Sequence, residues 1–498
     1  DPKRPFTRDW FNDGQKAAVR HVLGSRDRIM VIRGVAGTGK TTLEQEIGEA
    51  LAEAGKPVVA IAQSVKASRE VLREEAGFAS ADTVARFLKD AEMQQAAGGG
   101  VILVDEASQL GTRDMHAVFT VAEAVNARVV LVGDRRQHKS VTAGEPLKLL
   151  EERSGLPVAE VTEILRQKGD YKRAAAALSE GRIGEAFAEL DRLKWVREVG
   201  DKERYRELAD AYLAASKERT KDGKQKTALV VSPTHAEAAR VTDAVRSALK
   251  NDGTLTKERT VTTLVAAHLT DAQKADATEY EPGDLIQFHQ NARGHTKGSR
   301  LVVGDGITPP TELAGRFEVY RPRPLALAAG DRIRITAGGK TKDGEHRLSN
   351  GSLFTVEGFT PKGDIRVNGG WVIGKDFGHL THGYVATSHA SQGATVHKVF
   401  VAVAAESLKA TDQRTAYVAL TRGKEQAVVF TDDRAELLKA ATRTDTSLSA
   451  TELVDPKPAR PTALPKRRRA FQHGPAVPEF APMATKQVEA ARGDDHAR

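Results

Sequence analysis

The stretch that decides the fold reads Ile29-Met-Val-Ile-Arg-Gly34-Val-Ala-Gly-Thr-Gly39-Lys40-Thr41. Its apolar start predicts a buried β-strand, its glycine-rich middle predicts a tight loop, and the residues from Lys40 onward predict a helix. The spacing GxxxxGK[ST] between a strand and a helix is typical of polyphosphate sites, because glycines let backbone N–H groups turn towards phosphate oxygens. This order of elements predicts a nucleotide-binding P-loop and disfavours the alternative, a coincidental glycine-rich turn.

The loop residues have distinct expected functions. We expect Gly34, Gly37 and Gly39 to shape the loop around the phosphates. Lys40 is expected to contact the β- and γ-phosphates of ATP, and the Thr41 hydroxyl is expected to bind Mg²⁺. ATP and Mg²⁺ are therefore the expected cofactors.

A second apolar run, Val101-Ile-Leu-Val, ends in two adjacent carboxylates, Asp105 and Glu106. Asp105 can bind Mg²⁺, while Glu106 can orient or deprotonate an attacking water. An Asp-Glu pair that caps the next helix is the alternative, and the position after a P-loop disfavours it. The pair favours hydrolysis over phosphoryl transfer to another substrate.

A third apolar run, Leu131-Val-Gly133, leads to Asp134 and Gln137. Both side chains are placed to reach the γ-phosphate from a neighbouring strand. We interpret them as a sensor that links the nucleotide state to movement.

Short apolar runs alternate with amphipathic helical stretches, which predicts an α/β fold with parallel sheets. We expect a first domain at 1–166 and a second, discontinuous domain at 167–270 and 383–440. Glycine-rich turns between short strands predict an inserted all-β module at 271–382. The segment 455–498 contains seven of the 19 prolines and four consecutive basic residues at 466–469, so we expect a disordered basic tail.

Composition excludes several classes of protein. The 498 residues carry 75 Lys and Arg against 67 Asp and Glu, a formal charge of +8 that permits a polyanionic partner. The absence of cysteine excludes disulfides, thiolate zinc sites and a cysteine nucleophile, which fits a cytoplasmic protein. The sequence shows neither a run of roughly 18 to 20 apolar residues nor a signal-peptide core, so we expect no membrane insertion. A start at Asp1 suggests that the chain is part of a longer protein.

A series of blocks in this order resembles the superfamily 1 helicases, specifically their RecD-like branch, over residues 11–433. The blocks are FNDGQ (11–15), GVAGTGKTT (34–42), AIAQSVKAS (60–68), ADTVARFL (81–88), VDEAS (104–108), GDRRQ (133–137), EILRQ (163–167), VSPTHAEAAR (231–240), SHASQG (388–393) and VALTRGK (418–424). The resemblance implies two tandem RecA-like P-loop domains, an inserted module of the SH3 or OB kind, and a nucleic-acid-stimulated ATP hydrolase.

The same resemblance implies roles for further residues. Gln15 is assigned to adenine, and Thr38, Thr42, Gln392 and Gly393 to nucleotide binding. The implied catalytic set is Lys40, Asp105, Glu106, Gln137, Arg166 and Arg422, in which the two arginines act across a cleft between domains. Backbone contacts with single-stranded DNA, independent of base sequence, are assigned to Ser64, Lys66, Thr83, Thr234, His235, Ser388 and His389.

A finer resemblance involves EYEPGDLIQFHQN (279–291), GDRIRIT (330–336), NGSLFTVEG (350–358) and the basic tail. These segments are similar to the C-terminal helicase half of plasmid conjugative relaxases of the TraI and TrwC kind. This finer resemblance implies a relaxase domain in the same parent chain and secretion or coupling machinery as partners, whereas the resemblance to RecD-like helicases implies 5′-to-3′ movement. Two alternatives stay open: a free-standing RecD-like repair helicase or RNA translocase, and a non-unwinding module that binds DNA or recruits partners in response to ATP.

Overall fold

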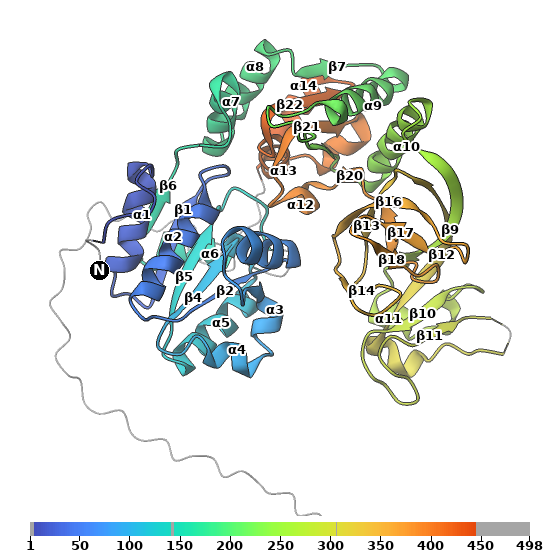
Figure 1. Ribbon diagram of the computed structural model, residues 1–498, viewed down its shortest axis with the longest axis horizontal. Coiled ribbons are helices and arrows are strands. Elements are labelled where there is room, and N and C mark those ends of the chain that lie inside the picture. Colours follow the sequence, from blue (N-terminus) through green and yellow to red (C-terminus); the bar gives the residue numbers. More distant parts are fainter. Residues whose placement is uncertain (1–3, 141–143, 305, 445–498) are drawn as a thin grey trace, which may run out of the picture. The chain divides into compact units, whose positions relative to one another are not determined.

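A computed structural model describes residues 4–140, 144–304 and 306–444. It contains two wholly parallel sheets and a set of antiparallel sheets (Figure 1). This confirms the predicted α/β fold with two RecA-like sheets and an inserted all-β region. The predicted basic tail at 455–498 lies outside the described residues. Within the described ranges, the helices are too short or too polar to cross a membrane.

The first lobe (residues 4–168) is built on a six-stranded parallel sheet with the strand order β3-β2-β4-β5-β1-β6. Its strands are β1 (Ile29–Gly34), β2 (Val58–Ala62), β3 (Asp82–Thr83), β4 (Val101–Asp105), β5 (Arg128–Gly133) and β6 (Val158–Val161). Its helical segments are α1 (Asp13–Gly24), α2 (Lys40–Glu53), the π-helix η1 (Lys66–Glu75), α3 (Val84–Phe87), α4 (Ala91–Gln95), η2 (Ala107–Gln109), α5 (Thr112–Ala124) and α6 (Pro146–Arg153).

Both faces of the first sheet are apolar. In β1, Val31 packs with Val104 on one face, while Met30 and Ile32 pack with Leu43 of α2 on the other. Successive strand residues point to opposite faces, so a β-branched run buried on both sides is what a parallel sheet covered by helices requires. The polar residues that follow β1, β4 and β5 therefore gather at one edge of this sheet.

The second lobe (residues 169–255 and 383–444) has a five-stranded parallel sheet with the order β20-β8-β21-β22-β7. Its strands are β7 (Val196–Glu198), β8 (Ala228–Val231), β20 (Val385–Ala386), β21 (Val396–Val403) and β22 (Gly423–Thr431). Its helical segments are α7 (Gly169–Glu180), α8 (Ile183–Arg192), α9 (Asp201–Lys217), α10 (His235–Asn251), α12 (Ser388–Ser391), η5 (Ala405–Ala410), α13 (Gln413–Leu420) and α14 (Arg434–Ala441). The short strand β7 interrupts a segment that looks helical from its sequence.

The insertion (residues 256–382) is antiparallel throughout its described part, with a four-stranded sheet β11-β10-β12-β9, a five-stranded sheet β18-β17-β16-β13-β19 and the pair β14-β15. Its strands are β9 (Thr256–Ala266), β10 (Leu285–Phe288), β11 (Arg300–Val302), β12 (Phe317–Ala329), β13 (Arg332–Ile335), β14 (Gly339–Lys340), β15 (Arg347–Leu348), β16 (Leu353–Phe359), β17 (Ile365–Val367), β18 (Trp371–Ile373) and β19 (Leu380–His382). Its short helical segments are α11 (Asp271–Lys274), η3 (Ala277–Glu279) and η4 (Thr311–Arg316).

The insertion begins earlier than the sequence pattern predicts. The expected boundary at 270 falls after β9, yet β9 pairs antiparallel with β12 along most of its length. The chain leaves the second lobe after α10 and returns at β20, which pairs with β8. The antiparallel region is thus a true insertion in the second parallel sheet.

Candidate nucleotide and nucleic-acid sites

The P-loop lies between β1 and α2, as the sequence predicts. Gly37 and Gly39 have φ angles of 84° and 77°, a left-handed conformation that residues with a side chain rarely adopt. A Cβ atom at Gly34 would lie 2.8 Å from the side chain of Lys40. Lys40 Nζ donates a hydrogen bond to the Gly34 carbonyl oxygen at 3.0 Å, so the ammonium group is held over the loop.

A cavity of about 430 Å³ opens beside this loop. All six residues predicted to be catalytic line it, although they come from distant parts of the chain. The predicted residues on its wall are Gly37, Thr38, Gly39, Lys40, Thr41, Asp105, Glu106, Gln137, Arg166, Gly393 and Arg422. Both lobes therefore contribute to one cavity, whose wall carries both oxygen ligands and guanidinium groups.

Two carboxylates follow β4 at the cavity. Glu106 has a φ of 49°, an uncommon left-handed conformation for a residue with a side chain, and its N–H donates to Asp105 Oδ1 at 2.7 Å. Burial, followed by the charge of Glu106, raises the pKa of Asp105 to about 6. The ionised form of Asp105 is thus disfavoured in this site.

The residues present fit a divalent cation. Mg²⁺ commonly takes one or two protein oxygens and completes its shell with phosphates and water, and Thr41 and Asp105 offer such oxygens at the cavity wall. Within the described ranges, no cluster of three or more acidic or His side chains forms an all-protein metal cage. A cation here would favour the ionised form of Asp105, which burial and the charge of Glu106 disfavour.

Glu44 is a buried carboxyl group that the sequence motifs do not reveal. It lies on α2, one turn after Lys40, and it is fully buried. Burial and the charge of Asp105 raise the pKa of Glu44 well above its ordinary value. The residue therefore favours its neutral form, and its i+4 spacing from the P-loop lysine is the signal that could have identified it.

Two arginines also line the cavity: Arg422 of the second lobe, which is buried, and Arg166 at the end of the first lobe, which is partly buried. Arg422 Nε donates to the Val418 carbonyl oxygen at 2.8 Å, and Arg166 Nη1 donates to the Thr421 carbonyl oxygen at 2.9 Å. Burial lowers the pKa of both groups, that of Arg166 to about 10 with a further contribution from the charge of Arg422. An anion at the cavity would relieve this concentration of buried positive charge, which fits the γ-phosphate of ATP.

Tyr417 connects the two lobes and is absent from the predicted site. Its hydroxyl donates to Asp134 Oδ2 at 2.7 Å and accepts the N–H of Ala36, in the P-loop, at 2.7 Å. Its side chain is 1% exposed, and burial raises its pKa well above the ordinary value, so it remains a donor. Gln137 Nε2 also donates to Asp134, at 3.1 Å. One hydrogen-bonded group thus joins the P-loop, the segment that follows β5, and helix α13.

Four residues predicted to bind nucleotide do not line the cavity: Gln15, Gly34, Thr42 and Gln392. Gln15 forms the capping box of α1 with Asn12. Its Nε2 also donates to the Thr38 carbonyl oxygen at 3.1 Å, which helps to hold the P-loop in place. Gln392 Nε2 donates to Glu106 Oε2 at 3.2 Å. Gln15 and Gln392 are therefore placed to act through their neighbours.

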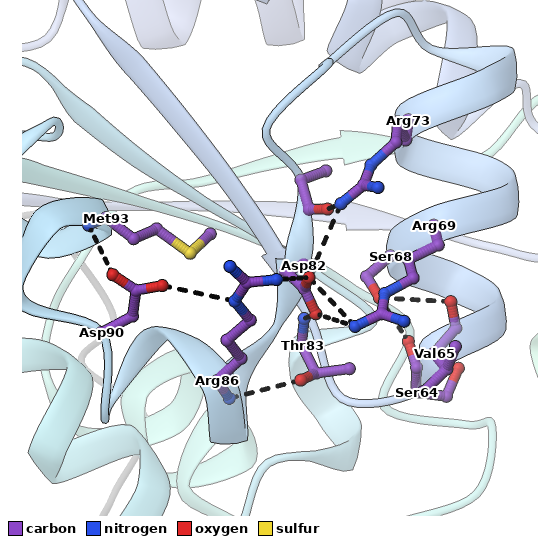
Figure 2. A network of polar contacts seen from close by, with 11 residues as sticks. Ser64, Val65, Ser68, Arg69, Arg73, Asp82, Thr83, Arg86, Asp90 and Met93 are labelled. Carbon is purple, nitrogen blue, oxygen red and sulfur yellow. Dashed lines mark hydrogen bonds and ion pairs between the residues drawn. The ribbon is translucent and has the colours of Figure 1, made fainter. Parts of the chain in front are cut away.

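Two of the predicted DNA contacts lie at the ends of adjacent strands (Figure 2). Ser64 follows β2, and its Oγ accepts the N–H of Ala67 at 3.0 Å. Thr83 ends β3, and its Oγ1 accepts the N–H of Arg86 at 3.3 Å. Lys66, also predicted to contact DNA, is the first residue of η1 and lines the nucleotide cavity.

Three predicted DNA contacts of the second lobe, Thr234, Ser388 and His389, are engaged in protein contacts. Thr234 caps α10, which begins at His235, and shares a hydrogen bond of 2.7 Å with Ser407. Ser388 Oγ lies 2.6 Å from His138 Nε2, and the His389 ring stacks on the His138 ring at 3.7 Å. These last two residues therefore meet the loop that follows β5 in the first lobe.

This chain is similar in sequence to several known proteins. Residues 10–201 match a family model described as an AAA domain. The multifunctional conjugation protein TraI of Escherichia coli (strain K12) is 26% identical, over 98% of this chain and 31% of its own length. The ATP-dependent RecD2 DNA helicase of Deinococcus radiodurans is 31% identical, over 36% of this chain and 25% of its own length. This chain spans about a third of the length of the curated relatives that match most of it.

Solved structures show a more distant likeness. A crystal structure of Bacteroides Pif1 bound to single-stranded DNA shares 15% sequence identity with this chain. The match covers 89% of this chain and 95% of that one, with a TM-score of 0.49.

Proposed function

We propose that this chain, with its AAA domain of the RecD/Pif1-like superfamily 1 helicase type and its distant homology to TraI, is an ATP-driven motor on single-stranded DNA. The helicase family implies ATPase activity. The finer proposal is that the motor moves 5′ to 3′, and it comes from the RecD-like resemblance of the motifs.

The observation that supports this proposal best is the cavity that unites P-loop, carboxylates and two arginines. Lys40 would hold the β- and γ-phosphates, and Glu106 would orient or deprotonate the attacking water. Mg²⁺ held by Thr41 and Asp105 would neutralise charge on the phosphates. Arg166 and Arg422 would stabilise the charge that develops on the transferred phosphoryl group.

Coupling to movement would use the groups that both lobes share. The Tyr417 hydroxyl contacts both the P-loop and Asp134, so a change in the bound phosphates would alter the hydrogen bonds that hold α13 of the second lobe. Ser64 and Thr83 of the first lobe, and Thr234 of the second, are our proposed contacts with DNA phosphates. If the two lobes bind the DNA backbone with strengths that alternate with the nucleotide state, each cycle of hydrolysis would move the protein one step along the strand.

The biological setting is a further proposal. Homology to TraI over nearly the whole chain supports the motor part of a conjugative DNA-transfer protein. We propose that it acts in the cytoplasm, which a sequence without cysteine fits. Its partners would then be a relaxase domain in the same parent protein and the secretion or coupling machinery.

Steady-state ATPase activity with and without single-stranded DNA tests the proposal. We expect strong stimulation by DNA in the wild-type chain and none in Lys40→Ala and Arg422→Ala. Unwinding of duplexes with a 5′ tail, but not a 3′ tail, would then support the polarity. A wild-type chain whose hydrolysis responds to neither DNA nor RNA would contradict the motor and favour a nucleotide-dependent binding module.

A further inference from the structure

Gln167 is a buried polar residue at the end of the first lobe, and its side chain contacts the second. It ends the EILRQ block, whose resemblance assigns a role to Arg166 and none to Gln167. It is 1% exposed. Its Nε2 donates hydrogen bonds to two backbone carbonyl oxygens of the second lobe, that of Thr421 at 3.1 Å and that of Gly423 at 2.7 Å. Gln167 therefore holds the backbone on both sides of Arg422.

The segment that contains Gln167 is also bound to the P-loop. The Gly37 carbonyl oxygen accepts the backbone N–H groups of Leu165 at 2.8 Å and of Arg166 at 3.0 Å. The packing is close, because a Cβ atom at Gly37 would lie 2.8 Å from Arg166 Cβ and 3.1 Å from Gln167 Oε1. One short segment thus contacts both the loop proposed to hold the phosphates and the backbone that carries Arg422.

The position of the Arg422 guanidinium depends on this stretch of backbone. Its Nε donates to the Val418 carbonyl oxygen at 2.8 Å, and its Nη2 donates to Thr421 Oγ1 at 3.2 Å. Both partners lie within four residues of Arg422, so a shift of this backbone would move the guanidinium with it. A displacement of about 1 Å can cost a catalysed reaction on the order of 100-fold. Hydrogen bonds that fix this backbone are therefore expected to affect the rate of hydrolysis without touching ATP.

We propose that Gln167 is a positioning residue for ATP hydrolysis, which holds Arg422 in place for the γ-phosphate of ATP in the P-loop. This inference rests on the proposed function. The alternative is a contact that only joins the lobes. Such a contact would affect stability or ATP binding, and its loss would have the same effect whether or not Arg422 is present. Loss of a positioning residue instead lowers kcat, leaves ATP binding unchanged and has no effect once Arg422 is removed.

Gln167→Met removes both hydrogen bonds and keeps the length of the side chain. We expect kcat for ATP hydrolysis to fall by roughly 10- to 100-fold, while the affinity for a fluorescent ATP analogue stays close to wild type. The affinity for ADP with aluminium fluoride, a mimic of the transferred phosphoryl group, should fall along with kcat. Gln413→Met is the matched control, because Gln413 Nε2 donates to the Gly181 carbonyl oxygen at 3.0 Å within the second lobe. Its kcat should equal that of wild type.

A double-mutant cycle tests whether Gln167 acts through Arg422. In single turnovers with excess protein, the double variant Gln167→Met/Arg422→Ala should hydrolyse ATP at the rate of Arg422→Ala alone. An equal loss in both backgrounds would show that Gln167 acts independently of Arg422, and would overturn the proposal. Wild-type kcat in Gln167→Met, loss of ATP binding in that variant, or wild-type kcat in Arg422→Ala would each overturn it as well.

A second variant and the wild-type chain keep the outcomes distinct. Melting curves followed by circular dichroism identify a misfolded Gln167→Met. In that case Gln167→Glu, which keeps the shape of the side chain and replaces the donating nitrogen with an oxygen, decides by the same measurements. The response of wild-type hydrolysis to single-stranded DNA tests the motor separately. A chain that hydrolyses ATP without responding to DNA would contradict the motor and leave the role of Gln167 in hydrolysis intact.

Discussion

The two parallel sheets share an architecture but meet the cavity with different chemistry. In the first sheet, β1 ends in a loop whose left-handed glycines turn the backbone towards the cavity. In the second sheet, β8 leads instead to Ser232-Pro-Thr234, and the lobe reaches the cavity mainly through Arg422 at the end of α13 and the segment 393–395. We infer that nucleotide binding depends on the backbone of the loop after β1, in the first lobe. Hydrolysis depends in addition on a few side chains of the second lobe.

Arg422→Ala should separate ATP hydrolysis from ATP binding most clearly. We expect kcat for ATP hydrolysis to fall by about 10³-fold or more, because an arginine at the γ-phosphate acts chiefly in the transition state. ATP affinity, measured by titration with a fluorescent analogue, should stay close to wild type. Lys40→Ala should instead lose binding. If Arg422→Ala also failed to bind ATP, the second sheet would be part of the binding surface and the contrast would fail.

Glu106→Gln tests whether the first sheet contributes chemistry beyond its backbone. Loss of the carboxylate that orients water should lower single-turnover hydrolysis by roughly 10²- to 10³-fold. The amide keeps the size of the side chain, and binding of ATP and DNA should persist. Hydrolysis near the wild-type rate would show that another group serves the attacking water.

Tyr417→Phe tests the link between the sheets. The change leaves Asp134 and the Ala36 N–H without their shared partner, a loss of about 1–3 kcal/mol for buried groups. We expect DNA-stimulated kcat to fall roughly tenfold. Tyr171→Phe is the matched control, because the Tyr171 hydroxyl donates to the Leu420 carbonyl oxygen within the second lobe. Equal losses in both variants would show a general packing effect.

A smaller effect concerns acid stability at the contact between His138 and His389. Burial, then the charges of His389 and Arg422, lower the pKa of His138 to about 3. Below pH 6.5 the unfolded chain takes up a proton that the folded chain refuses, so stability is present at neutral pH and is lost as the pH falls. The loss at pH 5 should be about 2 kcal/mol.

His138→Gln should therefore be less sensitive to acid. We expect its melting temperature to drop less than that of wild type, by a few degrees, between pH 8 and pH 5. Equal drops in the two proteins would show that His138 does not control this response.

Much of the fold and the cavity could be predicted because local pattern and topology agree there. Each block with a clear apolar run, such as those before Gly34, Asp105 and Asp134, became a parallel strand. Parallel strands present their carboxyl ends at one edge of a sheet, so residues distant in sequence meet. The wall of the cavity contains most of the residues that this reasoning selects.

The remaining features depend on tertiary contacts that leave no local pattern. The Tyr417 hydroxyl acts on a loop of the other lobe, and its sequence neighbours read as an ordinary apolar helix. Lys66 lines the cavity beside the P-loop, although its block of sequence resembles a DNA contact. Strand β9 is mostly exposed, so its apolar alternation is too weak to mark the start of the insertion. Likewise, Arg69, Arg73 and Arg86, which pair with the buried Asp82, look like ordinary surface charges in the sequence.

The place where the insertion joins the second sheet has an evolutionary consequence. The chain departs after α10 and returns at β20, and Leu255 and Tyr384, on either side of the insertion, pack in one apolar cluster. Val385 pairs with Val230, so the returning strand β20 lies beside β8, the strand that precedes α10. A segment of different size or origin could be exchanged there without changing the order of the parallel strands. Recombination could thus attach a different inserted segment to the same two parallel sheets, while the residues that line the cavity keep their positions.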